Sequence, residues 1–98
     1  MLKKTIEYVD YNGVERKEDF YFNLSKAEVT EMELSVDGGL ANMLEQIVNS
    51  KDNKRIIELF KKIILKAYGE KSLDGRRFMK SEEISQAFAE TEAYSELF

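Results

Sequence analysis

The chain has 98 residues, no cysteine and no histidine, and its formal net charge is −4 at pH 7. The absence of cysteine excludes disulfides, thiolate nucleophiles and zinc–thiolate sites, and the absence of histidine removes the commonest general base and metal ligand. The negative charge also argues against a nucleic-acid binder, because such proteins gain their affinity from clustered Lys and Arg.

The hydropathy of the chain predicts one soluble domain. Its residues are 43% hydrophobic and 35% charged, and no apolar run approaches the roughly 20 residues that a membrane-spanning helix needs. Lys3 and Lys4 precede Glu7 and Asp10 instead of an apolar stretch, so these residues do not form a secretory signal. We therefore expect a single domain over residues 1–98, in the cytoplasm and bound to no membrane.

Two β-strand patterns open the chain. Ile6 and Tyr8 alternate with polar residues, and a second run from Val14 to Leu24 carries Phe20 and Phe22 on one face. Between the two runs, Asn12-Gly13 is a strong turn signal because both residues tolerate positive φ. The pattern predicts an antiparallel β-hairpin over about residues 3–24, with its aromatic face packed on helices.

Two short helices are predicted next. Ser25 and Glu28 have the spacing of a capping box, which predicts a helix from Lys26 to about Leu34 with Val29, Met32 and Leu34 facing inward. Glycines 38 and 39 end that segment. Residues 40–48 then show the i, i+3, i+4 spacing of an amphipathic helix.

The longest amphipathic pattern runs from Asp52 to Tyr68. Asp52 is expected to cap its first turn, and Gly69 is expected to end it in the left-handed conformation. Its apolar residues cover about half of the circumference. We expect large side chains such as Phe60 to be buried there and to supply much of the core stability.

The last third of the chain contains a turn and further helical pattern. Asp74-Gly75 indicates a tight turn within a small ribbon over residues 72–78. Ser81 is expected to start a helix with Ile84, Ala87 and Phe88 facing inward. Thr91 either caps a further helical turn or lies within a continuous helix. The predicted fold class is therefore α+β, with an N-terminal antiparallel β-hairpin followed by a bundle of four to five helices over residues 25–98.

No constellation of residues indicates catalysis, a cofactor or a metal. The aspartates in the predicted loops lack the alternating acidic pattern of a calcium site. The glutamates of residues 82–96 are better explained as a solvated helix face than as an acid–base pair. Arg76 and Arg77 belong to the densest basic group, which forms either a salt-bridged surface or a grip on an acidic partner.

Apolar residues close the chain. Tyr94, Leu97 and Phe98 lack the Gly, Asn or basic last turn that normally marks a finished helix. They either fold back on the core or present an apolar surface to a partner or to another copy. The candidate partner-binding residues are Phe88, Tyr94, Leu97, Phe98, Arg76 and Arg77.

Three passages together resemble a known family. Asp10–Leu34, Ala67–Ser81 and Phe88–Phe98 occur in the order and at the spacing typical of tail assembly chaperones of long-tailed bacteriophages from Gram-positive hosts. The resemblance covers nearly the whole chain. It implies a noncatalytic homo-oligomeric protein of the host bacterial cytoplasm, absent from the mature virion. Such a protein coats the tape measure protein, keeps it soluble and helps to recruit the tail tube protein.

Two questions stay open on the sequence. Families of this kind often make a short form and a longer, frameshifted form, and the resemblance does not decide whether Phe98 is the natural C-terminus. The alternative function is a small phage or prophage regulatory adaptor that binds a host protein. Co-purification with tail proteins would separate the two hypotheses.

Overall fold

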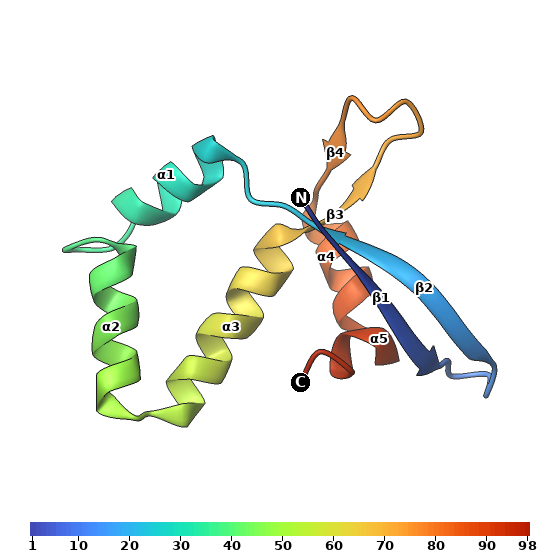
Figure 1. Cartoon of the computed structure of the whole chain (residues 1–98), viewed down its shortest axis with the longest axis horizontal. Helices are drawn as coiled ribbons and strands as arrows, with labels where there is room; N and C mark the ends of the chain where they lie inside the picture. Colours follow the sequence, from blue (N-terminus) through green and yellow to red (C-terminus); the bar gives the residue numbers. More distant parts are fainter. The chain divides into compact units, whose positions relative to one another are not determined.

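The computed structural model describes all 98 residues and confirms the α+β class, the N-terminal antiparallel hairpin and a count of five helices (Figure 1). No helix combines the length and the apolar character needed for a membrane crossing. The elements in chain order are β1 (Leu2–Val9), β2 (Glu15–Phe22), α1 (Lys26–Leu34), α2 (Leu40–Ser50), α3 (Asn53–Ala67), β3 (Tyr68–Lys71), β4 (Phe78–Met79), α4 (Glu82–Ala89) and α5 (Glu92–Ser95).

The chain divides into two compact units. The strand unit comprises residues 1–23 and 65–98, and the helical unit comprises residues 24–64. The strand unit contains a four-stranded antiparallel sheet in the order β1-β2-β3-β4. The predicted hairpin is therefore one half of a larger sheet.

The turn between β1 and β2 follows the predicted signal with one difference. Gly13 adopts φ 78°, whereas Asn12 keeps a negative φ. The Gly13 amide donates to the Asp10 carbonyl at 2.9 Å, and the Asp10 amide donates to the Val14 carbonyl at 2.9 Å. Only one residue of the turn needs the left-handed conformation that favours glycine.

The two faces of the hairpin differ as predicted. Ile6 pairs with Glu18 and Leu2 with Phe22, and Ile6 and Phe22 are buried on the inner face. On the outer face the Thr5 hydroxyl donates to Asp19 at 2.6 Å, and Lys17 lies 3.7 Å from Glu7. The period-two alternation of a half-buried strand accounts for both faces.

An aromatic cluster on the inner face forms the core of the strand unit. Phe88 of α4 is only 2% exposed and stacks on Tyr68, with ring centroids 4.1 Å apart. The ring centroids of Phe20 and Phe22 lie 5.3 and 5.8 Å from that of Phe88. The predicted packing of the hairpin on helices is confirmed.

The expected inward face of α4 needs one correction. Phe88 is buried and Ile84 is half-buried, but Ala87 is exposed. Successive helical residues are rotated by about 100°, so Ala87 leaves the face that holds Phe88. The sheet covers a narrower stripe of α4 than expected.

The start of α3 was predicted correctly and its end was not. The Arg55 amide donates to the Asp52 carboxylate at 3.2 Å, which is the expected cap. The helix ends at Ala67, and Tyr68 and Gly69 begin β3 instead. Gly69 is not among the glycines with positive φ. A Cβ at Gly69 would lie 2.6 Å from the Phe78 ring, so the glycine permits close packing instead of a left-handed end.

The predicted ribbon after Gly69 exists with different bounds. Glu70 pairs with Met79 and Lys71 with Phe78, so the strands lie on either side of residues 72–77. Those residues form the turn, in which Gly75 has φ 76°. The Ser72 amide closes the turn by donating to the Arg77 carbonyl at 2.9 Å. The expectation that residues 72–78 themselves pair was wrong, because the turn uses six of them.

The helical unit begins with α1, whose capping box is confirmed. The Glu28 amide donates to the Ser25 hydroxyl at 3.2 Å, and the Ser25 amide donates to the Glu28 carboxylate at 3.0 Å. Of the expected inward positions, Met32 is half-buried. The prediction was wrong for the other two, since Leu34 is 81% exposed and Val29 is also exposed. Helix α1 packs on α2. None of its nine residues is buried, because so short a helix makes only a small contact.

Replacing Ser25 with Ala should destabilise α1 by about 1 kcal/mol, because the Glu28 amide in its first turn loses the Ser25 hydroxyl as its partner. Hydrogen exchange of the α1 amides measures this local loss. Ser35→Ala is the matched control at the other end of the same helix, where the hydroxyl donates to the Met32 carbonyl at 2.8 Å. Equal losses in the two variants would contradict the capping role.

Candidate functional site

An apolar groove lies between α2 and α3 in the helical unit. The two helices run in opposite directions and are joined at Lys51, which adopts φ 56° (Figure 1). The groove has a volume of about 160 Å³. All of its lining side chains are apolar: Leu44, Ile47, Val48, Ile56, Leu59, Phe60 and Ile63.

Helical periodicity places these side chains on facing surfaces. On α2, positions 44, 47 and 48 follow the i, i+3, i+4 rule, and on α3 positions 56, 59, 60 and 63 do the same. Ile47 is buried, while Val48 remains 59% exposed and Phe60 43% exposed. The groove therefore has a buried floor and an exposed apolar rim.

The exposure of Phe60 corrects an expectation. The sequence predicts that Phe60, on the longest helix, is buried in the core, whereas the structure leaves it 43% exposed. Within the helical unit, α2 covers only part of the apolar arc of α3, because that arc spans about half of the helix. The remaining apolar surface includes Ile57, which is 49% exposed.

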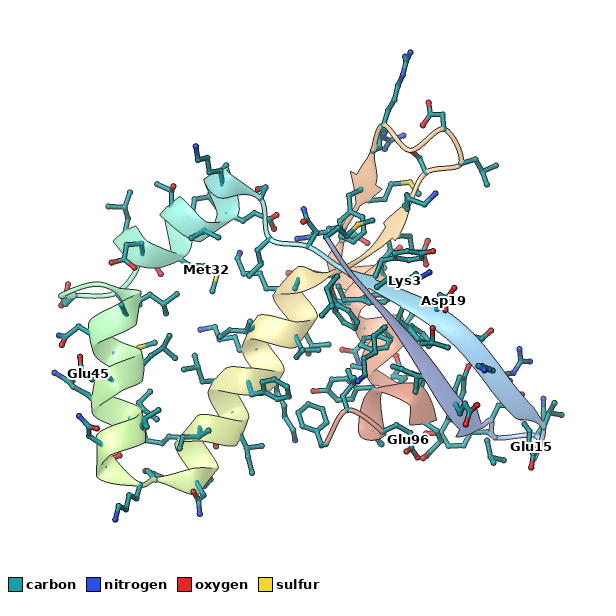
Figure 2. The ribbon with its side chains drawn as sticks, viewed as in Figure 1. Lys3, Glu15, Asp19, Met32, Glu45 and Glu96 are labelled. Carbon is teal, nitrogen blue, oxygen red and sulfur yellow. The ribbon has the colours of Figure 1, made fainter.

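The charges beside the groove are unevenly distributed. Helix α3 carries five basic residues, Lys54, Arg55, Lys61, Lys62 and Lys66, against the single acidic residue Glu58. The only charged residue of α2 is Glu45, which points away from α3 (Figure 2). A helix that is apolar on one face and acidic on its flanks would match both the apolar groove and the net positive charge of α3.

The predicted partner-binding residues near the C-terminus lie in the strand unit. Phe88, Tyr94 and Phe98 form a row of rings, with centroids 5.6 Å apart for the first pair and 5.0 Å for the second. Phe88 is the buried end of this row, whereas Phe98 is 50% exposed and Leu97 is half-buried. Burial raises the pKa of the Tyr94 hydroxyl. Of these aromatic and aliphatic residues, Phe98 is the most exposed.

The other two predicted binding residues lie in the turn between β3 and β4. Arg76 and Arg77 are exposed, and their amides donate to Asp74 at 3.1 Å and to the Ser72 hydroxyl at 3.0 Å. The hydrogen bond from Ser72 is the main cause of the lowered pKa of Asp74. The turn is thus ordered by its own side chains, and both arginine side chains project from it.

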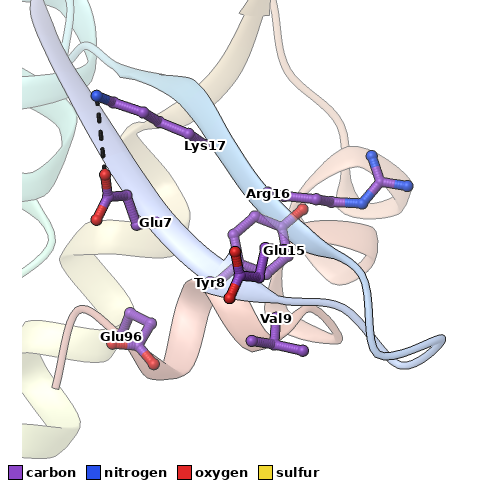
Figure 3. Close-up of a pocket in the computed structure, with 7 residues that line it drawn as sticks. All are labelled: Glu7, Tyr8, Val9, Glu15, Arg16, Lys17 and Glu96. Carbon is purple, nitrogen blue, oxygen red and sulfur yellow. Dashed lines mark ion pairs between the residues drawn. The ribbon is translucent and has the colours of Figure 1, made fainter.

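A second hollow, of about 580 Å³, lies at the turn end of β1 (Figure 3). Three carboxylates line it, those of Glu7, Glu15 and Glu96, beside Lys17 and Arg16. The hydrogen bond from Arg16 at 2.6 Å is the main cause of the lowered pKa of Asp10. The Tyr8 hydroxyl donates to Glu18, and this bond is the main cause of its raised pKa.

Sequence reasoning missed both hollows as sites. The groove residues were interpreted as core because apolar helical stripes usually are core. The breadth of the α3 arc was the one available signal, since a half-circumference stripe exceeds what a single neighbouring helix covers. The second hollow depends on the approach of Glu96 to β1, which no local pattern encodes.

Comparison with known proteins identifies a family. The family model described as phage tail assembly chaperone matches residues 1–98. No curated protein and no solved structure matches the chain.

Proposed function

The chain belongs to the phage tail assembly chaperone family, and from this membership we propose that its apolar groove binds helical segments of the tape measure protein and keeps that protein soluble. Members of the family act with protein partners during tail assembly in the host cell. The observation that carries the proposal is the groove between α2 and α3, lined only by apolar side chains and open at its rim.

A helix is the occupant that fits the groove. Two neighbouring antiparallel helices present rows of side chains, between which a third amphipathic helix inserts residues at i, i+3, i+4 and i+7. The groove residues Leu44, Ile56 and Ile63 would contact that apolar face. The lysines of α3 would contact acidic flanks and exclude a basic helix.

The remaining parts of the proposal concern the assembly. Several copies coat one tape measure protein in the host cytoplasm, the tail tube protein is recruited to this coat, and the chaperone leaves before the virion matures. No step requires catalysis. Phe98, Leu97 and Tyr94 form a second apolar contact, supported from within by the buried Phe88, and Arg76 and Arg77 contact acidic groups of a partner.

Val48→Asp is expected to weaken binding of a tape measure helix by about ten- to a hundredfold. Burial of a Val side chain contributes about 1.5 kcal/mol or more, and the new carboxylate would lose its hydration in the groove. The measurement is isothermal titration of the chain with synthetic tape measure helices, together with the soluble fraction of the full tape measure protein in co-expression. Val48 is 59% exposed, so the free chain should fold normally.

Asn49→Asp is the matched control, because it adds the same charge one residue away on α2 and outside the groove. It should leave binding within twofold of the original chain. A third variant replaces Tyr94, Leu97 and Phe98 with Ser. If this variant alone loses binding while Val48→Asp keeps it, the groove is not the binding site.

A further inference from the structure

Strand β1 has an unpaired edge. It is the first strand in the sheet order and pairs only with β2 along all of its eight residues. The Asp10 amide donates to the Val14 carbonyl, so Tyr8, Ile6 and every second residue before them direct their amides and carbonyls toward β2. The backbone groups of Lys3, Thr5 and Glu7 therefore point away from β2, along the edge with which no other strand pairs. Helix α5 also contacts β1, and Glu96, just after that helix, lines the same hollow as Glu7 and Val9.

The side chains of these three outward positions are complementary to themselves. Lys3, Thr5 and Glu7 all lie on the outer face and follow one another at every second position. In an antiparallel pair centred on Thr5, the lysine of one strand faces the glutamate of the other, twice. Lysines on an edge strand normally oppose pairing with another chain, because like charges meet. Here the antiparallel register converts them into two opposite-charge pairs.

We propose that a second copy of this chain adds to the free edge of β1, antiparallel and with the two-fold axis at Thr5. Three residue pairs then exchange backbone hydrogen bonds, about six in all. The result is one continuous sheet of eight strands, twice the four of a single chain. A two-fold interface of this kind joins two identical surfaces and closes the edge.

The hollow at the turn end of β1 supports this register. In the proposed pair, Lys3 of the second copy lies opposite Glu7, beside the hollow that Glu7, Glu15 and Glu96 line (Figure 3). The existing contact of Glu7 with Lys17 is 3.7 Å long and both side chains are largely exposed. The Glu7 carboxylate therefore has acceptor capacity for a second ammonium group.

A register shifted by two residues lacks this complementarity. With the axis at Ile6, Lys3 would face Val9 and Thr5 would face Glu7, so no opposite charges would meet. Shifts of a single residue are excluded, since they would turn the inner face, with Ile6, toward solvent. The pair centred on Thr5 is the register that the charges favour.

The inference deepens the proposed function, which requires several copies, but its test uses the chain alone. The chain has no cysteine, so Thr5→Cys introduces a single thiol. The Cα atoms of opposed bonded residues lie about 5.5 Å apart, within the range of a disulfide. A mild oxidant should convert most of this variant to a covalent dimer at micromolar concentration.

Asp19→Cys is the matched control. Asp19 faces Thr5 on β2, and either substitution removes the same hydrogen bond. In the proposed pair the two copies of residue 19 are three strand spacings apart, about 14 Å, which is too far for a disulfide. Equal cross-linking of both variants, or none of Thr5→Cys, would overturn the register.

Charge reversal tests the same pair without cross-linking. Lys3→Glu and Glu7→Lys should each weaken dimerisation on the order of tenfold, because each places two like-charged pairs across the edge. The double variant should recover the original dimerisation constant, measured by sedimentation equilibrium. If the double variant dimerises as weakly as the single variants, the result contradicts the proposed register. If the original chain stays monomeric at high concentration, the dimer proposal is wrong. If the original chain dimerises but does not bind a tape measure helix, the result contradicts the groove as a binding site and leaves the dimer proposal intact.

Discussion

Phe88→Ala should lower the free energy of unfolding by about 3–5 kcal/mol, the largest effect of any single truncation in the strand unit. The ring is 2% exposed and meets Tyr68, Phe22 and Phe20 at once. Removing it leaves a cavity among rings that are held by different strands and cannot all move inward. Small domains have total stabilities of about 5–15 kcal/mol, so a loss of this size removes about a third or more of the stability of a domain in the lower half of that range.

Urea unfolding, monitored by tyrosine fluorescence and far-ultraviolet circular dichroism, measures the loss in the free energy of unfolding. Phe98→Ala is the matched control, because it removes the same side chain from a position that is 50% exposed. It should cost clearly less in stability. Similar losses for both variants would show that Phe88 is not the centre of the core.

Gly69→Ala should destabilise the protein by about 1–3 kcal/mol, against the usual trend for this change. The added methyl would lie 2.6 Å from the edge of the Phe78 ring and 2.8 Å from the Met79 carbonyl oxygen. The carbonyl belongs to the paired strand β4 and cannot move without breaking the pairing of Glu70 with Met79. The steric cost therefore exceeds the stabilisation that alanine normally provides by lowering the conformational entropy of the unfolded chain.

A second background tests the cause of this loss. In a Phe78→Ala variant the ring contact is gone, and the contacts with the Met79 carbonyl oxygen and with Lys80 Cγ at 3.0 Å remain. In that background Gly69→Ala should lower the free energy of unfolding, measured by urea unfolding, by substantially less than it does in the original chain. An unchanged cost would mean that the Phe78 ring is not the obstacle.

Local signals predicted the elements well. The Ser25 capping box, the Asp52 cap and the turn at Gly13 all use atoms within a few residues of one another, and each is present. The alternation of Ile6 and Tyr8 with polar residues also placed the correct face of β1 inward. The α+β class follows from such patterns because they depend only on backbone geometry and neighbouring side chains.

Local signals failed where a distant segment decides the outcome. A glycine after an amphipathic segment, as at Gly69, is a typical signal of a helix end, but Gly69 lies in β3 and packs closely against Phe78. Phe60 and Leu34 occupy apolar helical positions, but the covering neighbour is too small to bury them. Periodicity reports which side of a helix is apolar and does not report what packs against that side.

The candidate sites show the same division. The sequence by itself determined the amphipathic faces of α2 and α3, the complementary charges of Lys3 and Glu7, and the apolar character of Tyr94 to Phe98. Only the tertiary structure decided that two of those faces enclose a groove, that β1 is an edge strand and that Phe88 is buried. The physical reason is that burial and pairing depend on contacts between segments far apart in the chain, whereas periodicity and capping depend on near neighbours alone.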